Sequence, residues 1–577
     1  MPVHNKEITE KLTEVADLLD IKGENEFRVR AYRNAVRTIS GLSKSVAGMV
    51  DEDEDIFSLP DIGESMAEKI NEIVKTGKLK QLKKLKKEVP SSLIEIMKLE
   101  QMGPERTKIL YDELDIDSIG DLKKAVEAGK VEELKGFGKK TVENIKREIA
   151  EYSKKGGSKR VKRSEAEEEI QPLVYYLNGK MDDVTIAGSF RRKKETVGDI
   201  DILATSSNTK KAMKAFTEFD EVDRVIAHGE SKSSIKLRTG LQVDLRIVEK
   251  NEFGAALLYF TGSKEHSVAL RKIGQEKDLK VNEYGVFSGK KKLAAKTEKK
   301  MYKALGLRYI EPELREDKGE FDASRNNKLP KLIELDDIKG DLQTHTKASD
   351  GKYSLKEMVE AAQDLGYEYY AVTDHSKKVT MANGLDEKRL AKQIEEIDGL
   401  NKKMKKIKIL KSVEVDILED GSLDLPDDIL KELDIVICSI HYNMNLSKKK
   451  QTRRILKAME NPHFNILAHP TGRMINKRSP YDVDMEEIMK EAKDKGCFLE
   501  INANPDRLDL DDDNARMAKE IGLKLSISTD AHSTDNLNFM KYGVAQARRG
   551  WLEKDDVLNT RSWNDLKKLL KKRKVGK

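Results

Sequence analysis

The chain has few of the features that mark secreted or membrane proteins. Its 577 residues include only two cysteines, Cys438 and Cys497, too few for the disulfide framework of a secreted protein. It contains no run of about 18 or more apolar residues, which excludes a transmembrane helix. The opening segment MPVHNKEITEKL lacks the apolar stretch of a secretion signal. We therefore expect a cytoplasmic protein that does not bind membranes.

The chain also has little net charge for its length. It has 109 Lys and Arg against 103 Asp and Glu, a net charge of +6 that predicts no partner by itself. Basic clusters at residues 78–87 and 158–163 lie where contacts with nucleic-acid phosphates would need them. A solvated, lysine-rich helix face is the alternative. A chain of this length exceeds one hydrophobic core, so about three to five domains are expected.

Three stretches with different periodicity follow one another. Up to about residue 150, apolar residues recur at helical spacing, as at Ile8, Leu12 and Val15. From about residue 170, short alternating segments such as GDIDILAT predict an α+β domain, with a Thr-Gly hairpin in SSIKLRTGLQVDLRIVEK. From about residue 335, apolar runs alternate with amphipathic helices, which predicts parallel β/α units. Charge-rich segments at 151–169 and 315–332 predict linkers between the stretches.

Three segments of the helical stretch share one layout. In SLPDIGESMAEKI, LEQMGPERTKIL and ELKGFGKKTVENI, a tight turn with glycine leads into a helix; the glycines are Gly63, Gly103, and the pair Gly136 and Gly138. Glycine lets the backbone approach a phosphate while the first N–H groups of the helix point at it. The repeated helix-hairpin-helix layout predicts binding to the DNA backbone, and ordinary helix caps are the alternative.

Three aspartates form the strongest chemical signal. Asp199 and Asp201 lie two residues apart on a predicted strand, so both carboxylates project from one face. Asp244, in LQVDLRIV, completes a three-carboxylate cluster if its strand pairs with the first one. Such hard oxygen ligands suit two Mg²⁺ ions, which can activate a primer hydroxyl and stabilise a leaving pyrophosphate.

Donor groups for a triphosphate precede these aspartates. Gly188 and Ser189 offer backbone and hydroxyl donors, and Arg191 and Arg192 supply positive charge. The motif GSFRR followed by GDIDIL resembles the nucleotidyltransferase signature of family X DNA polymerases. The resemblance implies that Ser189 and Arg192 contact the triphosphate beside Gly188, and that the three aspartates hold the metal ions.

A second segment, YFTGSKEHSVALR, resembles the sugar-and-template element of the same family. The resemblance implies that Tyr259 and Phe260 lie against the incoming sugar, that Gly262 lines the nucleotide pocket and that Arg271 faces the template. Ser267 stands where an asparagine that contacts the base edge is expected. Without the resemblance, the Tyr-Phe pair is equally a core aromatic pair.

The N-terminal helices resemble the domain of this family that binds the 5′ end of a gap. Lys69 falls at the place of the family's lyase lysine. A Schiff base at an abasic sugar needs a lysine whose pKa is lowered by burial or by cationic neighbours. In a segment this rich in lysine, a solvated surface role is the alternative.

Most histidines of the last stretch follow apolar runs, where the catalytic face of a β/α barrel is built. Mixed imidazoles and carboxylates favour Zn²⁺, Mn²⁺ or Fe²⁺ over Mg²⁺, and such ions can ionise water for attack on phosphorus. The residues at these run ends are His375, Glu414, His441, His469, Asp530 and His532.

The same region resembles the polymerase-and-histidinol-phosphatase (PHP) domain through DLQTHTKASDG, VTDHS, VEVDI, SIHYN, LAHPTGR and STDAHS. Gln343 replaces the first histidine of the usual H-x-H pair, and His266 and His463 fit no metal pattern. The resemblance implies a site for up to three Mn²⁺ or Zn²⁺ ions, with the ligands His345, Asp350, His375, Glu414, His441, His469, Asp530 and His532.

We therefore expect a multi-domain fold: an all-α helix-hairpin-helix region, an α+β nucleotidyltransferase palm with a thumb, and a C-terminal, distorted TIM-like β/α PHP barrel. The expected boundaries are 1–90 for the DNA-end-binding, lyase-like domain, 91–155 for a fingers-like helix-hairpin-helix domain, 165–250 for the palm, 251–316 for the thumb, 317–336 for a linker and 337–577 for the PHP domain.

The parts follow the order known for prokaryotic family X enzymes, and the resemblance implies a repair polymerase that fills short gaps with dNTPs at gapped or nicked DNA. We expect it to be a monomer. Its PHP domain would remove 3′ nucleotides or blocked 3′ ends and cut at abasic sites. One rival is a 3′-end-cleaning phosphoesterase whose polymerase-like half mainly grips DNA, which Ser267 favours and the intact carboxylate trio opposes. Another is a non-catalytic repair scaffold, which leaves both metal constellations unexplained.

Overall fold

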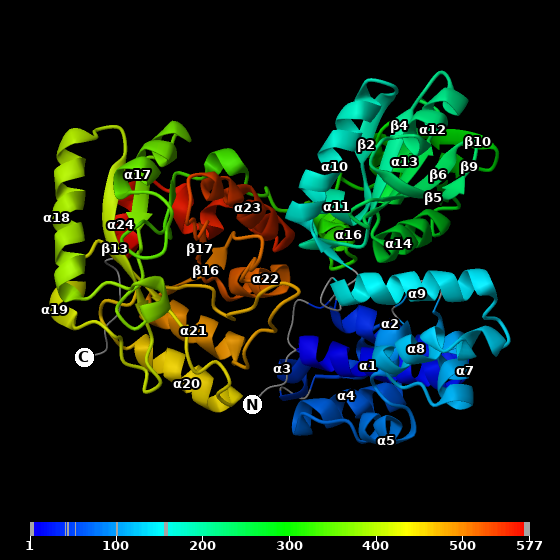
Figure 1. The fold of residues 1–577 in the computed structure, drawn as a ribbon, viewed down its shortest axis with the longest axis horizontal. Coiled ribbons are helices and arrows are strands. Elements are labelled where there is room, and N and C mark those ends of the chain that lie inside the picture. Colours follow the sequence, from blue (N-terminus) through cyan, green and yellow to red (C-terminus); the bar gives the residue numbers. More distant parts are fainter. Residues whose placement is uncertain are drawn as a thin grey trace. The chain divides into compact units, whose positions relative to one another are not determined.

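The structure is a computed structural model that describes residues 5–40, 42, 46–51, 54–97, 99, 102–154 and 160–570. The chain forms two compact units, residues 1–160 with 317–321, and residues 161–316 with 322–577. Each unit is drawn in Figure 1. Every helix in the described ranges is too short or too polar to span a bilayer. Cys438 and Cys497 are both buried and do not form a disulfide.

The first unit is helical, as its periodicity predicts. Ile8, Leu12, Val15 and Leu19 are all at most 1% exposed, because their spacing places them on one face of the first helix. The described part of residues 5–154 contains no strand. Its helices are α1 (Asn5–Lys22), α2 (Glu26–Ser40), α3 (Val46–Asp51), α4 (Glu64–Thr76), α5 (Lys80–Glu88), α6 (Leu93–Met97), α7 (Pro104–Leu114), α8 (Ile119–Glu127) and α9 (Lys139–Lys154), with the short 3-10 turns η1 (Ile56–Ser58) and η2 (Lys130–Glu133).

The second unit begins with a five-stranded sheet in the order β2-β4-β7-β6-β5. The predicted Thr-Gly hairpin is confirmed, because β6 and β7 pair antiparallel on either side of Thr239 and Gly240. The elements are β1 (Val161–Lys162), α10 (Arg163–Asn178), β2 (Asp182–Ile186), α11 (Gly188–Arg191), β3 (Thr196–Val197), β4 (Asp199–Thr205), α12 (Thr209–Thr217), β5 (Val222–His228), β6 (Lys232–Leu237) and β7 (Gln242–Ile247).

Both predicted linkers are shorter than expected. Residues 161–169 belong to β1 and α10, because Ala166 and Ile170 begin an apolar face that packs into the sheet core. In the second segment, Arg315 is fully buried rather than solvated, since Glu298 pairs with its guanidinium. Residues 155–159 of the first segment lie outside the described residues.

A small subdomain with four α-helices and a three-stranded sheet, ordered β10-β9-β8, follows the first sheet. Helix α13 contacts both β4 of the first sheet and α15 of the subdomain, so it joins the two. The elements are α13 (Phe253–Thr261), α14 (Lys264–Gln275), β8 (Lys280–Asn282), β9 (Gly285–Ser288), β10 (Lys291–Ala294), α15 (Glu298–Ala304), η3 (Pro312–Leu314) and α16 (Glu320–Arg325).

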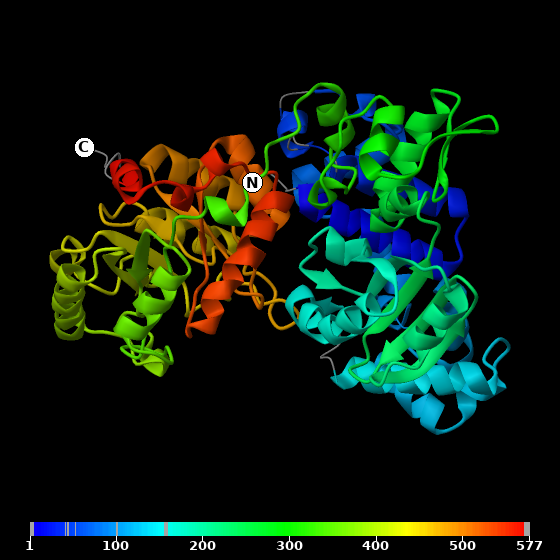
Figure 2. The ribbon, with the colours of Figure 1, turned by 90° about the horizontal axis from the view of Figure 1, so that it is seen from above.

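The rest of the chain is a seven-stranded parallel sheet in the order β11 to β17. It nearly closes into a barrel, with an isolated parallel bridge between Thr344 and Ala531. Helices cover the outer side of the sheet, as Figures 1 and 2 show. Strands buried on both faces can be apolar along most of their length. The strands are β11 (Gly340–Asp341), β12 (Tyr369–Val372), β13 (Lys408–Asp416), β14 (Ile435–Ser439), β15 (Ile466–Leu467), β16 (Phe498–Asn502) and β17 (Leu525–Ser528).

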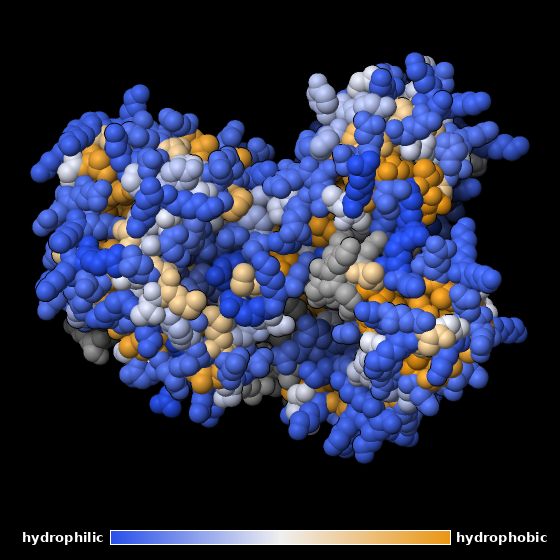
Figure 3. Space-filling view, viewed as in Figure 1, coloured by the Kyte–Doolittle hydropathy of each residue, from blue (hydrophilic) through white to orange (hydrophobic). Residues whose placement is uncertain are grey.

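Helices and short 3-10 turns connect the barrel strands and surround them. On the face in Figure 3, hydrophilic residues dominate and hydrophobic ones form small separate groups, as expected for a chain that is 37% charged. The elements are η4 (Leu335–Asp337), α17 (Leu355–Asp364), η5 (Thr380–Ala382), α18 (Glu387–Lys403), α19 (Asp427–Leu430), α20 (Lys448–Ala458), α21 (Met485–Lys495), α22 (Asp512–Ile521), η6 (Asp535–Phe539), α23 (Met540–Arg549), η7 (Lys554–Asp556), η8 (Leu558–Thr560) and α24 (Trp563–Leu570).

Ion pairs join the barrel to the first sheet within the second unit. Helix α23 lies on the side of the barrel next to α10 and α11 (Figure 1), and its Lys541 pairs with Glu167 of α10 at 3.0 Å. Two further pairs, Lys162 with Asp506 and Glu195 with Arg473, involve the loops that follow β16 and β15. The barrel and the sheet are therefore connected by charged contacts close to the ends of the barrel strands.

Candidate active sites

The three predicted carboxylates meet on the first sheet. Strands β4 and β7 pair in parallel, and Asp201 is the direct partner of Asp244 in their register. Asp199 lies two residues before Asp201, so all three carboxylates project from one face. The Gln242 amide donates to Asp244 Oδ1 at 3.1 Å, and Lys232 Nζ lies 3.6 Å from Asp244 Oδ2. The sheet thus brings together the carboxylates that the sequence places in two separate motifs.

The electrostatics of this face favour a divalent cation. Burial and the negative charges of Asp199 and Asp244 together raise the pKa of Asp201 to about 7, against the smaller opposing effects of Lys232 and Arg192. A bound cation would relieve this repulsion between like charges. The three residues present therefore fit metal ions held by hard oxygen ligands.

The turn after β2 approaches these carboxylates so closely that it requires a glycine. Gly188 has φ +59°, and a Cβ at this position would collide with the Asp201 carboxylate. Ser189 follows it on α11, the short helix that leads to both predicted arginines. The tight turn brings backbone N–H groups next to the carboxylate face, where a triphosphate could accept from them.

The two arginines of this helix have different partners. Arg191 forms a two-pronged pair with Glu298, with N–O distances of 2.8 and 2.7 Å. Its guanidinium also donates to the Thr261 hydroxyl at 2.6 Å, and its role in supplying charge to a triphosphate stays a prediction. Arg192 instead donates through Nη1 to the Thr261 carbonyl at 2.6 Å and lies beside Gly262, where a Cβ would be 3.4 Å from Nη1. Arg192 thus adjoins the predicted nucleotide pocket at Gly262.

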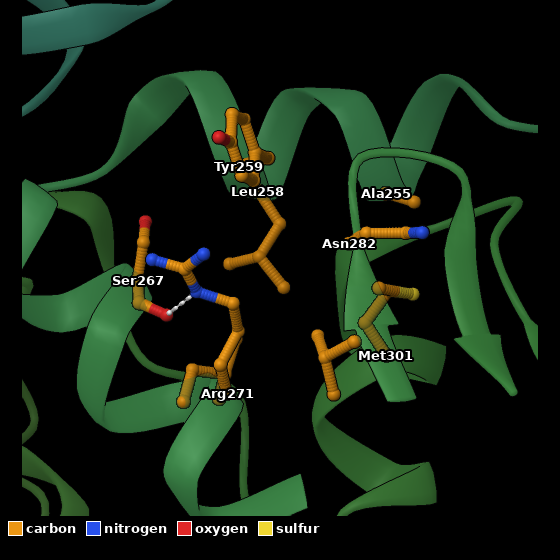
Figure 4. Close-up of a pocket in the computed structure, with 9 residues that line it drawn as sticks. Ala255, Leu258, Tyr259, Ser267, Arg271, Asn282 and Met301 are labelled. Atoms are coloured by element: carbon orange, nitrogen blue, oxygen red, sulfur yellow. Dashed lines mark hydrogen bonds between the residues drawn. The ribbon is translucent and has the colours of Figure 1, made fainter. Parts of the chain in front are cut away.

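Helix α13 carries the predicted aromatic pair. Tyr259 and Phe260 make an edge-to-face contact with ring centres 5.1 Å apart, and the Arg246 guanidinium lies 4.5 Å from the Phe260 ring centre. Tyr259 also lines a surface pocket with Ser267 and Arg271, in which Arg271 Nε donates to the Ser267 carbonyl at 3.3 Å (Figure 4). Tyr259 remains 37% exposed, more than a core aromatic residue would be.

The helix-hairpin-helix glycines lie at helix starts in the first unit. Gly63 and Gly103 are the N-caps of α4 and α7, and neither helix start has a side-chain cap. Gly136, with φ +89°, and Gly138 precede α9, and the space around all four glycines is open. Uncapped N–H groups in open space are the arrangement that a phosphate needs.

Lys69 lies on α4 and donates to the Ser65 carbonyl at 2.7 Å. Partial burial lowers its pKa, and the positive charge of Arg28 lowers it further, against the opposing effect of Glu68. A lowered pKa makes the neutral amine more available as a nucleophile.

The barrel gathers all eight predicted ligands at the carboxyl ends of its strands. Two groups have ligand atoms within 4.8 Å of one another: His345, Asp350, His375 and His532, and His375, Glu414 and His441. The remaining two ligands adjoin these groups, with His469 Nε2 2.9 Å from Glu414 Oε1 and Asp530 Oδ1 3.1 Å from His345 Nε2. Glu414 lies within β13, which runs to Asp416, and not after the strand as the sequence suggested.

The charges within this cluster shift several pKa values. Burial lowers the pKa of His532 but the carboxylates of Asp350 and Asp530 outweigh it and raise this pKa to about 9. Burial and the nearby Arg507 lower the pKa of His469 to about 4. Both His469 and Asp530 have positive φ, at 31° and 55°, a backbone strain that folds retain mainly at functional sites.

Buried polar atoms without hydrogen-bond partners show that this cluster fits metal ions. They include His345 Nδ1 and both amide atoms of the fully buried Gln343. Two further buried atoms, His345 Nε2 and Glu414 Oε2, face other ligand candidates, Asp530 Oδ1 at 3.1 Å and His375 Nδ1 at 2.9 Å. Each buried polar atom left unpaired costs about 1–3 kcal/mol, a cost that cation binding would remove for the acceptor atoms. The mixed nitrogen and oxygen donors suit Mn²⁺ or Zn²⁺.

Several residues that support the cluster were missed from the sequence. Asp416 Oδ1 lies 3.1 Å from His441 Nδ1, and Glu500 accepts from the His469 backbone at 2.8 Å. Arg507 Nε lies 3.6 Å from Asp530 Oδ2, lines the same pocket as the metal-ligand candidates, and has a buried Nη1 without a hydrogen-bond partner. Asp416 is the last residue of β13 and could have been found by its strand-end position, whereas Glu500 lies in the middle of β16 and Arg507 lies in a loop, where neither gave a signal. His266 is buried and bonds the Tyr302 hydroxyl, and neither it nor His463 joins a metal group.

Five protein-family models match the chain. They describe a helix-hairpin-helix domain over residues 3–79, a SAM-like helix-hairpin-helix tandem over 93–151, a DNA polymerase beta palm over 160–260, a DNA polymerase beta thumb over 256–316 and a PHP domain over 341–504.

One relative covers the whole chain. The "DNA polymerase/3'-5' exonuclease PolX" of Bacillus subtilis (strain 168) is 39% identical over 581 residues, which span 99% of this chain and 100% of the relative. The chain belongs to the family X DNA polymerases that carry a PHP domain. The expected fold class of this family X polymerase is confirmed: helix-hairpin-helix helices, palm and thumb, and a nearly closed parallel barrel.

Other relatives match only the barrel of the polymerase. A probable phosphatase of Thermoanaerobacter sp. (strain X514) is 33% identical over 249 residues, 41% of this chain and 96% of the relative. A probable phosphatase of Caldanaerobacter subterraneus is 30% identical over 252 residues, 41% of this chain and 93% of the relative.

The family assignment does not favour the two rival interpretations, which are an end-cleaning phosphoesterase with a passive polymerase half and a non-catalytic scaffold. The full-length relative is named for synthesis as well as degradation.

Proposed function

We propose that this family X polymerase fills short gaps in DNA during repair, and that its PHP barrel removes 3′ nucleotides or blocked 3′ ends and cuts at abasic sites. The in-register pairing of Asp201 with Asp244 carries the proposal, because it assembles the carboxylate face that nucleotidyl transfer needs. The proposed substrates are dNTPs and gapped or nicked DNA, and we propose a cytoplasmic monomer, since these substrates occur where the chromosome is copied and repaired.

We propose the domain boundaries 1–90, 91–155, 165–250, 251–316 and 337–577, with a linker at 317–336. The family matches at 3–79, 93–151, 160–260, 256–316 and 341–504 support this order of domains. Within the helical domains, Gly63, Gly103, Gly136 and Gly138 would bring backbone N–H groups to DNA phosphates, and Lys69 would attack an abasic sugar.

In the palm, Asp199, Asp201 and Asp244 would hold two Mg²⁺ ions, which supply activation of the primer hydroxyl and charge stabilisation of the leaving pyrophosphate when bound. Arg192 and the N–H groups of the turn at Gly188 and Ser189 would bind and orient the triphosphate. The close approach of this turn to Asp201 supports the assignment, because it places donors and carboxylates on one face.

At the mouth of the nucleotide pocket, Tyr259 and Phe260 would lie against the incoming sugar beside Gly262, and Arg271 would face the template. The exposure of Tyr259 and its place with Arg271 in one surface pocket support this arrangement. Ser267 offers a shorter side chain to the base edge than the asparagine expected there, so it would contact the minor groove less.

In the barrel, the eight ligand residues His345, Asp350, His375, Glu414, His441, His469, Asp530 and His532 would hold up to three Mn²⁺ or Zn²⁺ ions, which supply an ionised water for phosphodiester hydrolysis when bound. We assign Arg507 to the substrate phosphate, because its Nη1 is buried without a partner in the pocket that these residues line. Arg507→Gln should then raise KM for a 3′-ended substrate.

A labelled one-nucleotide gap tests the proposal. Asp199→Ala in the full-length chain should abolish primer extension with Mg²⁺ and leave 3′ trimming with Mn²⁺ intact, and His345→Ala should do the reverse. Primer extension by Asp199→Ala at the normal rate would refute the palm assignment. Normal trimming by His345→Ala would refute the assignment of nuclease activity to the barrel.

A further inference from the structure

The predicted triphosphate arginine has a carboxylate as its neighbour. Arg192 Nε donates to Glu316 Oε1 at 3.1 Å, and Nη1 donates to the Thr261 carbonyl. Among the described residues, Arg192 Nη2 has no hydrogen-bond partner, so this nitrogen is available to a ligand. A carboxylate at this place would normally weaken triphosphate binding, since it competes with the phosphates for Arg192 and repels them.

A residue of the barrel binds the same carboxylate. Arg549, the last residue of α23, donates through Nη1 to Glu316 Oε1 at 3.0 Å and to the backbone carbonyl of Arg192 at 2.9 Å. Its Nη2 pairs with Asp512 of α22. The Arg549 side chain is 2% exposed, so this contact is buried in the fold and is not a surface ion pair.

The balance of charge explains why the carboxylate stays ionised. Burial raises the pKa of Glu316, but Arg549, Lys194 and Arg192 outweigh burial and lower it to about 2. Arg549 thereby offsets the negative charge that Glu316 places beside Arg192. Arg549 Nη1 donates to two acceptors next to the Arg192 side chain, the Glu316 carboxylate and the backbone carbonyl of Arg192 itself, and so fixes both.

We propose that Arg549 of the PHP barrel is a positioning residue for dNTP binding in the palm. It holds Glu316 and the backbone of Arg192 so that the outer guanidinium nitrogen of Arg192 remains available to the triphosphate. This inference rests on the proposed function, in which Arg192 contacts the triphosphate. The barrel then serves synthesis as well as degradation, because Arg549 of the barrel holds the residues that orient Arg192 in the nucleotide pocket.

Gap-filling kinetics of the full-length chain test the inference. Arg549→Gln should raise KM for dNTP by about tenfold, the effect of losing one hydrogen bond to a charged group, and change kcat by much less. Arg548→Gln is the matched control: Arg548 lies on the same helix and joins the barrel to the thumb through Glu313, but it does not contact Glu316 or Arg192. Adding Glu316→Gln to Arg549→Gln should restore KM, because the competing carboxylate is then gone.

Arg192→Ala separates this inference from the function on which it depends. If Arg192→Ala leaves KM for dNTP unchanged, the proposed role of Arg192 is wrong. If Arg192→Ala raises KM but Arg549→Gln behaves like Arg548→Gln, the role of Arg549 is wrong. Retained 3′ trimming with Mn²⁺ shows that each variant is folded. Should Arg549→Gln fail to fold, Arg549→Lys replaces it, with an intermediate rise in KM expected and an unchanged KM contradicting the proposal.

Discussion

Single residues at the two sites show how much depends on one side chain. Gln343 is fully buried with both side-chain atoms lacking hydrogen-bond partners, at the place where the PHP resemblance leads one to expect a histidine. An amide oxygen is a weaker ligand for Mn²⁺ or Zn²⁺ than an imidazole nitrogen. We therefore predict that Gln343 limits the metal affinity of this cluster.

Replacing this amide with imidazole should strengthen metal binding. We expect Gln343→His to lower the Mn²⁺ concentration needed for half-maximal 3′ trimming by about tenfold, the lower end of what metal-site substitutions change. Titration of Mn²⁺ against trimming rate measures this, and calorimetric Mn²⁺ binding gives a readout that does not need activity. Gln451→His, another buried glutamine with unpaired amide atoms but outside the cluster, is the control. An unchanged Mn²⁺ requirement would show that Gln343 does not contribute a ligand.

Gly188 is the residue on which the palm turn depends. Gly188→Ala should reduce gap filling at least tenfold, because the new Cβ would collide with the Asp201 carboxylate in a backbone conformation with φ +59°. Steady-state gap filling measures the loss. Gly179→Ala, in the loop after α10 where the nearest atom would be at 3.5 Å, is the matched control and should retain activity. Normal synthesis by Gly188→Ala would contradict the close approach.

At the scale of elements, helix starts are the proposed points of DNA contact. An aspartate in place of Gly138 should stabilise the start of α9, because negative charge favours a helix N-terminus, and should repel DNA phosphates. We expect Gly138→Asp to weaken binding to gapped DNA about tenfold in fluorescence anisotropy. Ser354→Asp puts the same charge at the N-cap of α17 in the barrel and should leave DNA affinity unchanged. Equal affinity of both variants would rule out phosphate binding at α9.

The contact between helices α11 and α15 depends on a buried ion cluster. Glu298 pairs with Arg191 at 2.7 Å and with Arg315 at 2.6 Å. Burial raises the pKa of Glu298, but the two arginines outweigh it and lower it to about 2 from the ordinary 4.5. The ionised carboxylate therefore stabilises the fold fully above about pH 4.5, and this contribution is lost as the pH falls towards 2.

Removing this carboxylate should reveal that pH dependence. Glu298→Gln should lower the free energy of unfolding by about 3 kcal/mol at pH 7, since it leaves the buried Arg315 without its charged partner. Urea unfolding at several pH values should show the difference between wild type and variant shrinking below pH 4.5. The i,i+4 pair of Lys214 and Glu218 is exposed, so Glu218→Gln is a control with little effect at any pH. A difference that stays constant down to pH 3 would contradict the ion-pair account.

At the scale of the whole molecule, the two units should respond differently to metal ions. Cation binding to the native barrel adds stability of about 2.7 kcal/mol at one hundred times the dissociation constant. Calorimetry should therefore show that Mn²⁺ raises the melting temperature of the unit with the barrel and leaves that of the helical unit unchanged. His441→Ala should reduce this shift, and a chelator should reverse it. An equal shift of both transitions would indicate nonspecific binding.

The residues of the family motifs could be read from the sequence, because each motif is a short, local pattern. The two-residue spacing placed Asp199 and Asp201 on one face, and Asp244 was expected there only if its strand paired with the first one, as the parallel register of β4 and β7 shows it does. The strand-end rule gave six of the barrel's candidate ligands and the PHP resemblance added His345 and Asp350, and the fold brings all eight together. Local periodicity determines which face of a strand each of these residues occupies, and tertiary packing leaves that face unchanged.

Only the tertiary structure decided which charged residue pairs with which. Arg191 and Arg192 are adjacent and chemically identical, yet Arg191 pairs with Glu298 and Arg192 with Glu316. Each partner lies more than one hundred residues away in the chain, so no local pattern shows which carboxylate each arginine will meet. The polar stretch at 315–332 likewise looked like a linker until Arg315 proved to be buried. Sequence patterns fix which face of a strand or helix a residue occupies; they do not fix long-range ion pairs, since any of many carboxylates could satisfy an arginine until folding brings one within reach.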